Sequence, residues 1–189
     1  MTAWKKRTVI MEFLGFMFGR CVIFGMNPVG MGYFLCMYGH EVNKGLLGIM
    51  VLLGMASAME KVEVIKYALV MGTVTVIMHL LRHSGKKITK KISYITGGIV
   101  TTALSLSKGI FTVDYKTQIL LSILEGGLAG ISAYLLQHGC TYLLYHKRKD
   151  GMSNAELISI GLMIGVLIYG IPKWGLNGVA LTFVIAYLV

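Results

Sequence analysis

Three ionisable side chains lie inside long apolar stretches of this sequence: Glu12, Arg20 and Glu125. A charge at the centre of a bilayer costs about 2.5–3.5 kcal/mol on insertion scales, so it normally faces other protein groups and finds a partner. Such charges either join helices as ion pairs or line a path for ions or protons. A path usually needs a relay of several acids or histidines, and only two buried acids are available. The sequence therefore favours a structural role.

The positions of these charges along their segments predict one ion pair. If segment 8–26 runs outward and segment 117–145 runs inward, Arg20 and Glu125 both fall in the outer half of the membrane. Their heights then differ by about 4–5 Å, which a long guanidinium side chain can bridge. We therefore predict an Arg20–Glu125 pair. Glu12 lies about 80° from Arg20 around the helix, and we expect it to extend toward the inner surface.

A second possible chemistry is nucleophilic catalysis by a cysteine. Cys140, with His138 or His79 as its base, would suit an integral-membrane cysteine peptidase that matures a signalling peptide. On a helix, however, His138 and Cys140 point about 200° apart. Packing as a small apolar residue is the plainer interpretation of Cys140. Since His79 and Cys140 both lie near the inner ends of their segments, the peptidase stays an alternative.

Metal, disulfide and transport functions have weaker support. Cys21, Cys36 and Cys140 form no CxxC pair, which argues against a metal site and against a disulfide framework. The hydroxyl clusters at 73–75 and 101–102 are the only ones that could line the pocket of a small-molecule transporter subunit. Such side chains usually bond to the backbone of their own helix. We therefore expect no metal and no cofactor in this chain, with the transporter as a further alternative.

The composition is typical of a membrane protein. The 189 residues are 56% hydrophobic and 14% charged, with a mean hydropathy of +0.72. Soluble domains carry about 25% charged residues, and a domain of this length has too small an interior to bury so much apolar surface. The net charge of +10 comes from short clusters between apolar runs. A nucleic-acid-binding face would instead combine basic and aromatic residues, so we expect no nucleic-acid partner.

Eight apolar stretches predict an all-α fold, a polytopic transmembrane helix bundle of about six to eight segments. We expect them to form a single transmembrane domain over residues 1–189. The stretches are 8–26, 28–39, 45–59, 64–81, 92–111, 117–145, 155–171 and 175–189. The first, fourth, fifth, sixth and seventh reach the length of about 17–25 residues that a spanning helix needs. The second is short and Gly-rich, so it is either a tilted span or a piece packed inside protein.

Local residues predict where two of these helices begin. Pro28 is expected at the first position of the second helix, where its missing N–H costs little, with Asn27 as the cap. Ser153 and Glu156 form a capping-box pattern before the seventh helix. The Asn-Pro pair therefore predicts a tight turn between the first two segments.

Basic residues predict the orientation. With a cytoplasmic N-terminus and every segment spanning, the cytoplasmic pieces hold twelve of the 18 Lys and Arg residues and the outer loops hold four. This is the asymmetry of the positive-inside rule. The two strongest clusters, RHSGKKITKK (82–91) and HKRKD (146–150), both lie inside. We expect a multi-pass protein of the cell membrane, with its N-terminus in the cytoplasm and the lipid bilayer as its first partner.

The stretch LGFMFGRCVIFGMNPVGMGYF (14–34) resembles the start of the membrane region of the stage II sporulation protein E family. Five positions match the pattern of that family; they are Gly19, Arg20, Gly25, Pro28 and Gly30. Val29 departs from it, since an aromatic residue is usual there. Residues 123–137 are similar to the Glu-containing, Gly-rich span of the family, and residues 152–171 to its Ser-Asn-x-Glu-Leu helix entry. The resemblance covers most of the chain, in order.

The resemblance implies a role in endospore formation. Members of this family combine an N-terminal bundle of membrane spans with a central region for self-association and for contact with the cell-division machinery. A C-terminal metal-dependent serine phosphatase of the PP2C type follows. It dephosphorylates an anti-anti-sigma factor, which leads to activation of the forespore sigma factor. The membrane region is expected to anchor the protein at the division septum.

The chain itself is expected to be non-catalytic. Its only aspartates are Asp114 and Asp150, each beside an apolar segment. A two-metal phosphatase needs several clustered aspartates to hold its cations, so the Mn or Mg ions of the family would belong to a phosphatase domain outside this sequence. We therefore expect a fragment, or a piece of a longer protein, that contains the membrane anchor.

Overall fold

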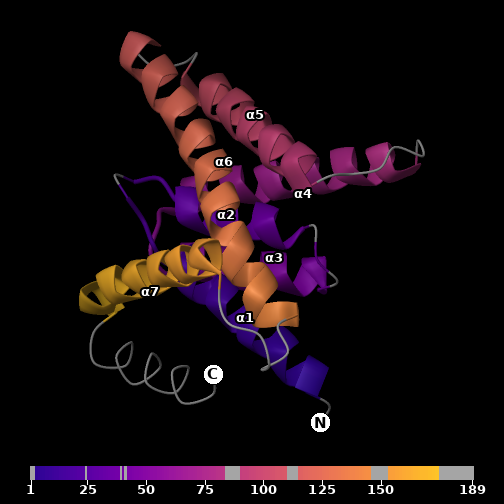
Figure 1. The fold of residues 1–189 in the computed structure, drawn as a ribbon. Helices are drawn as coiled ribbons and strands as arrows, with labels where there is room; N and C mark the ends of the chain where they lie inside the picture. The colour runs from indigo at the N-terminus through magenta and orange to yellow at the C-terminus, as the bar shows by residue number, and fades with distance from the viewer. Residues whose placement is uncertain are drawn as a thin grey trace.

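The computed structural model describes residues 3–23, 25–38, 40, 42–83, 90–109, 115–145 and 153–174. This part of the chain is all-α, as predicted, and is shown in Figure 1. Its seven helices are α1 (Ala3–Gly19), α2 (Pro28–Met37), α3 (Lys44–Ala56), α4 (Lys61–His83), α5 (Lys90–Gly109), α6 (Tyr115–Tyr145) and α7 (Asn154–Trp174). The predicted eighth segment, 175–189, and most of the basic stretch 82–91 lie outside the described residues.

The first helix ends earlier than predicted. We expected it to continue to residue 26, but α1 stops at Gly19. The chain then turns before α2, and Ile23 and Met26 exchange two backbone hydrogen bonds of 2.8 and 2.9 Å. Gly25 has a φ of 76°, a left-handed conformation that glycine adopts without steric cost. Arg20 therefore lies in a turn and not within a helical span.

A close contact between α1 and α3 explains why α1 needs glycine at its end. A Cβ atom on Gly19 would meet the carbonyl oxygen of Val51, and a Cβ atom on Gly54 would meet the carbonyl oxygen of Phe16. The two glycines therefore let the two backbones touch. Hydropathy along one segment contains no information about such a contact, so it could not mark the end of α1.

Helix α6 organises the rest of the fold. With 31 residues it is the longest described helix, and it packs against α5, α2 and α7 along its length. All ten residues of α2 are buried. Of the two interpretations of the short second segment, the structure supports a helix packed inside protein. A Met-rich core surrounds it, and its fully buried members include Met11, Met17, Met31, Met37, Met55 and Met78.

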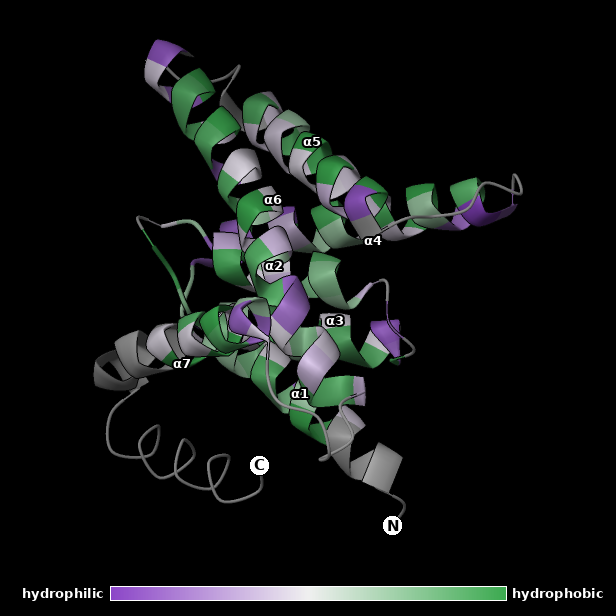
Figure 2. Ribbon diagram, in the orientation of Figure 1, coloured by the Kyte–Doolittle hydropathy of each residue, from purple (hydrophilic) through white to green (hydrophobic). Residues whose placement is uncertain are grey.

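Two helices of the described chain are long and apolar enough to cross a membrane: Lys61–His83 and Lys116–Tyr145. Shorter apolar helices cover Thr8–Gly19, Pro28–Met37, Lys44–Ala56 and Asn154–Gly165. Helix α5, which we expected to be a span, is not among them. The predicted count of about six to eight spans is therefore not confirmed. Figure 2 shows apolar residues on the outward faces of the long helices, not only between them.

Candidate functional site

Glu125 is the centre of a polar network between apolar helices. This α6 residue is 3% exposed. Its carboxylate accepts hydrogen bonds from Lys66 Nζ at 2.8 and 3.1 Å and from Ser105 Oγ at 2.6 Å. The Tyr67 hydroxyl donates a further hydrogen bond to Oε1. One carboxylate thus joins α4, α5 and α6, with a full cation among its donors.

The predicted Arg20–Glu125 pair is not formed, because Lys66 takes the place of Arg20. The Lys66 ammonium lies 2.8 Å from Glu125 Oε1 and 2.9 Å from Glu63 Oε2, so it bridges two carboxylates. The prediction assumed that a helix carries Arg20 along its face, but α1 has already ended there. The Arg20 guanidinium instead lies 6.0 Å from the centre of the Phe16 ring.

We did not predict Lys66 as the partner of Glu125, although this lysine lies within an apolar run. We predicted the fourth segment to begin at residue 64, which placed Lys66 at its edge. The helix begins at Lys61, so Lys66 lies more than one turn inside it. Its side chain is 12% exposed. A lysine inside VEVIKYALV is as unusual as an arginine in an apolar run, and it needed a partner for the same reason.

Asn27 joins the end of α1 to the start of α2. Its Oδ1 accepts a hydrogen bond of 2.7 Å from the backbone N–H of Gly30, which confirms the predicted cap. Pro28 occupies the first turn of α2, also as predicted. The side-chain amide donates to the carbonyl oxygen of Gly19, the last residue of α1. One fully buried side chain therefore satisfies a donor of one helix and an acceptor of the other.

Tyr67 connects this joint to the carboxylate network. Its hydroxyl accepts a hydrogen bond of 2.7 Å from the backbone N–H of Asn27 and donates to Glu125. The side chain of Tyr67 is fully buried. A continuous series of hydrogen bonds therefore runs from the end of α1 through Asn27 and Tyr67 to α6. Fully satisfied buried networks of this kind fix one arrangement of the elements that they connect.

Replacing Asn27 tests this joint. We expect Asn27→Ala to lower the free energy of unfolding by about 2 kcal/mol, because it removes a cap and leaves a buried carbonyl without its donor. Asn27→Asp keeps the cap acceptor but places an oxygen against the Gly19 carbonyl, so it should be no better. Thermal unfolding of the purified chain in detergent measures both.

The matched control is Asn43→Ala. Asn43 caps α3 by accepting a hydrogen bond of 3.2 Å from the N–H of Leu46, and it is exposed. Its replacement should cost about 1 kcal/mol, the value of a cap alone. Equal losses for Asn27→Ala and Asn43→Ala would contradict the second, donor role of Asn27.

The family-motif glycines lie at this same joint. A Cβ atom on Gly30 would come within 2.6 Å of Asn27 Oδ1 and 3.0 Å of the Phe18 carbonyl oxygen. Gly19 touches α3, and Gly25 has the positive φ of the turn. Val29, which departs from the pattern, is buried in α2. These positions therefore serve backbone packing and turning around Asn27.

The other candidate residues do not gather into a reactive site. Cys140 is fully buried in the core, whereas His138 and His79 are exposed, so the peptidase alternative gains no support. Thr75 and Thr101 donate to carbonyl oxygens of their own helices at 2.7 and 2.8 Å, which confirms the predicted bonding of these hydroxyls to their own backbone. Glu12 is 9% exposed on α1 and is not part of the Glu125 network.

A cavity of about 460 Å³ opens beside Glu125. Its polar lining includes Glu60, Glu63, Lys66, Gln118 and Ser122. The described residues contain no group of three or more His, Cys, Asp or Glu side chains that could hold a metal ion. Since Lys66 already pairs with both Glu63 and Glu125, the geometry suits the joining of helices.

Comparison with known protein families gives a match over the whole chain. The family model described as "SpoIIE, N-terminal domain" matches residues 1–189, the whole chain. No curated protein and no solved structure gives a significant match. The stretch 14–34, which carried the resemblance, forms the α1–α2 joint and its glycine contacts. The chain therefore belongs to the SpoIIE N-terminal domain family.

Proposed function

We propose that this chain is a multi-span membrane anchor, with its N-terminus and its basic stretches on the cytoplasmic side. The supporting observation is the outward face of α4. Large apolar side chains on this face have exposed fractions of 57–61%; they are Val62, Ile65, Leu69, Val76 and Leu80. The opposite face is also apolar and is buried in the core. A helix that is apolar on all sides is either buried or a membrane span, and α4 is not buried.

The polar groups complete this pattern. Several polar side chains, among them Glu125, Asn27 and Ser105, are buried between helices, while leucines, isoleucines and valines face outward on α4, α6 and α7. Water as the solvent would favour the reverse arrangement. Lipid favours apolar residues outside and satisfied polar groups inside. Membership of the SpoIIE N-terminal domain family supports the same conclusion.

Within a whole SpoIIE-family protein, the anchor would hold an attached PP2C-type phosphatase at the division septum during sporulation. Contact with the division machinery and activation of the forespore sigma factor would then depend on regions outside this chain. The chain fused to a fluorescent protein in sporulating cells tests the localisation. A band at the septum supports the proposal, and uniform membrane fluorescence would restrict the chain to general anchoring.

Cysteine labelling at the two ends of α4 tests the topology. We expect Lys61→Cys to react with an impermeant thiol reagent in intact cells, and Arg82→Cys to react only after the membrane is permeabilised. Both native side chains are exposed in the structure. The unsubstituted chain is the control, because Cys21, Cys36 and Cys140 are at most 2% exposed.

Each other outcome has a clear meaning. Labelling of both positions from the same side would show that α4 does not cross the membrane. Labelling with the two sides exchanged would preserve the span and reverse the orientation. Release of the chain from membranes by alkaline carbonate would contradict the anchor itself.

A further inference from the structure

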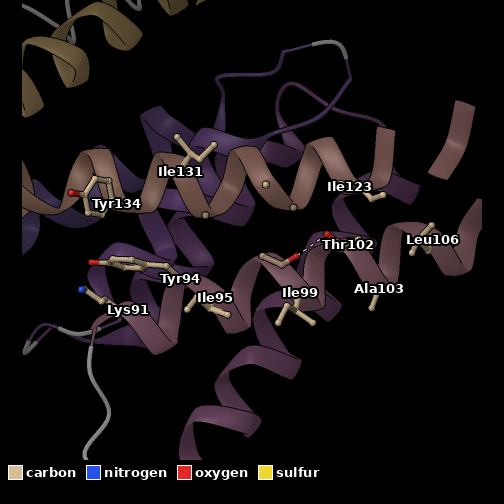
Figure 3. A pocket seen from close by; sticks show the side chains of 14 residues that line it. Lys91, Tyr94, Ile95, Ile99, Thr102, Ala103, Leu106, Ile123, Ile131 and Tyr134 are labelled. Atoms are coloured by element: carbon tan, nitrogen blue, oxygen red, sulfur yellow. Dashed lines mark hydrogen bonds between the residues drawn. The ribbon is translucent and has the colours of Figure 1, made fainter. Parts of the chain in front are cut away.

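An apolar groove of about 830 Å³ lies between α5 and α6, as Figure 3 shows. Its α6 side contains Gly126, Gly127 and Gly130, and its α5 side includes Ile95 and Ile99. Gly126 lets α6 approach α5 closely, because a Cβ atom there would meet the Thr102 hydroxyl. A Cβ atom on Gly127 would have no neighbour within 4 Å. The groove is therefore open along the helix pair, and glycines without side chains form its α6 side.

One end of this groove is polar. Lys91 Nζ and the hydroxyls of Tyr94 and Tyr134 point the same way at that end (Figure 3). Tyr94 is 6% exposed, and its hydroxyl has no hydrogen-bond partner among the described residues. Leaving a buried hydroxyl unpaired is costly, so a native structure normally provides a partner for it. An acceptor placed beside Lys91 would supply a partner for this hydroxyl.

We propose that the groove binds an anionic phospholipid, with its acyl chains along the glycine floor and its phosphate at Lys91, Tyr94 and Tyr134. Phosphate oxygens accept hydrogen bonds from both hydroxyls and carry the charge that complements the ammonium. Among the described residues, no Asp or Glu lines the groove. Lys91 also lies in the first turn of α5, where backbone N–H groups favour anions.

The proposed membrane orientation places this site in the cytoplasmic leaflet of the bilayer. Lys91 ends the basic stretch 82–91, which we place on the cytoplasmic side. Basic pockets between membrane helices on that side suit anionic head groups. The inference therefore rests on the proposed membrane location. A helix of a second copy is the alternative occupant of the apolar floor, and the groove-filling variants below test it.

Lipid titration of the purified chain tests the head-group site. Dioleoylphosphatidylglycerol and dioleoylphosphatidylcholine carry the same acyl chains and differ in net charge, so native mass spectrometry and thermal shift compare their binding directly. We expect the anionic lipid to bind more tightly and to raise the Tm further. Lys91→Gln should weaken that binding about five- to tenfold. The matched control is Arg82→Gln, which removes an exposed cation of the same basic stretch outside the groove.

Tyr94→Phe separates binding from folding. Removal of an unpaired buried hydroxyl should leave the Tm without lipid unchanged or raise it. The same substitution should reduce the additional Tm increase that the anionic lipid produces. A purely structural role of Tyr94 would change the first quantity and not the second.

A groove-filling pair tests the location of the acyl chains. Gly127→Leu should fold normally, because its side chain enters open space, and it should reduce binding of both lipids at this site. Gly72→Leu on α4 is the matched control, since a Cβ atom there also has no neighbour within 4 Å and Gly72 does not line the groove.

The remaining outcomes overturn the inference in distinguishable ways. Equal affinity for the two lipids, or equal losses for Lys91→Gln and Arg82→Gln, would refute a specific head-group site while leaving the anchor intact. A dimer that Gly127→Leu abolishes would assign the groove to a second copy. Release from membranes by alkaline carbonate together with no lipid binding would instead contradict the proposed membrane location.

Discussion

Lys66→Met is expected to destabilise the chain by about 3–5 kcal/mol, the usual result of removing one partner from a buried ion pair. Lys66 is the cation that bridges Glu63 and Glu125. Without it, the Glu125 carboxylate, which is 3% exposed, loses the cation that neutralises it. The Tm of the purified chain and its yield as a monodisperse species measure the loss. Lys61→Met removes an exposed cation of the same helix and should change neither.

The partner substitution should be milder. In Glu125→Gln the remaining side-chain oxygen accepts the hydrogen bond from Tyr67 at the Oε1 position, and the amide N–H replaces the acceptor at the Oε2 position and can donate to the Ser105 hydroxyl. Lys66 still pairs with Glu63. The double variant Lys66→Met with Glu125→Gln should therefore be more stable than Lys66→Met alone, because no buried carboxylate remains unpaired at position 125. This non-additivity is the sign of a direct pair.

Charge reversal distinguishes Lys66 from the partner that the sequence suggested. The double reversal Arg20→Glu with Glu125→Arg should not restore the stability lost by Glu125→Arg, since Arg20 lies in the turn after α1 and Lys66 is the cation that pairs with Glu125. Restoration would return Arg20 to the network. Similar losses for Lys66→Met and Lys61→Met would show that the Lys66 bridge contributes little.

The sequence predicted helices well where hydropathy alone determines them. The fourth, fifth, sixth and seventh apolar stretches each correspond to a helix whose start differs by a few residues from the prediction. Asn27 and Pro28 also predicted the start of α2 correctly, since a cap and an N-terminal proline act through local backbone geometry. These features need no knowledge of neighbouring elements.

The rest depends on tertiary contacts. The end of α1 is set by a backbone contact between Gly19 and Val51, residues that hydropathy treats as ordinary members of two apolar runs. The partner of Glu125 depends on which face of α4 turns toward α6, so charge positions along the axes were not sufficient. A charge inside an apolar segment still predicted the position of the network, because Glu125 lies at its centre.

The chain belongs to the SpoIIE N-terminal domain family, and several residues of the family motif take part in these contacts. Of the motif residues, Gly19 and Gly30 form hydrogen bonds with Asn27, and Pro28 follows it in the chain. Asn27 is connected through Tyr67 to Glu125. A bundle that faces lipid, as proposed for this chain, would have little hydrophobic driving force between its helices, so close glycine contacts and internal hydrogen bonds would determine its arrangement. Substitutions at the α1–α3 contact test directly whether glycine contacts determine the arrangement of the helices.

Gly54→Ala is expected to cost at least about 3 kcal/mol, the upper part of the range for overpacking a tight contact. The added methyl group would meet the Phe16 carbonyl oxygen, and the Cα atom of Gly19 lies 3.0 Å from the same position. These are backbone atoms of α1, so no side chain can rotate away. The Tm of the purified chain should fall, and the double variant with Gly19→Ala should fold in low yield or not at all.

Gly72→Ala is the matched control, because it also replaces a glycine inside a helix but adds its methyl group to open space. It should stabilise the chain by about 0.5–1 kcal/mol through helix propensity. The opposite signs of the two changes separate contact from propensity, since propensity alone favours alanine at both positions. If Gly54→Ala were as stable as Gly72→Ala, α1 and α3 would not touch through their backbones, and the end of α1 at Gly19 would need another cause.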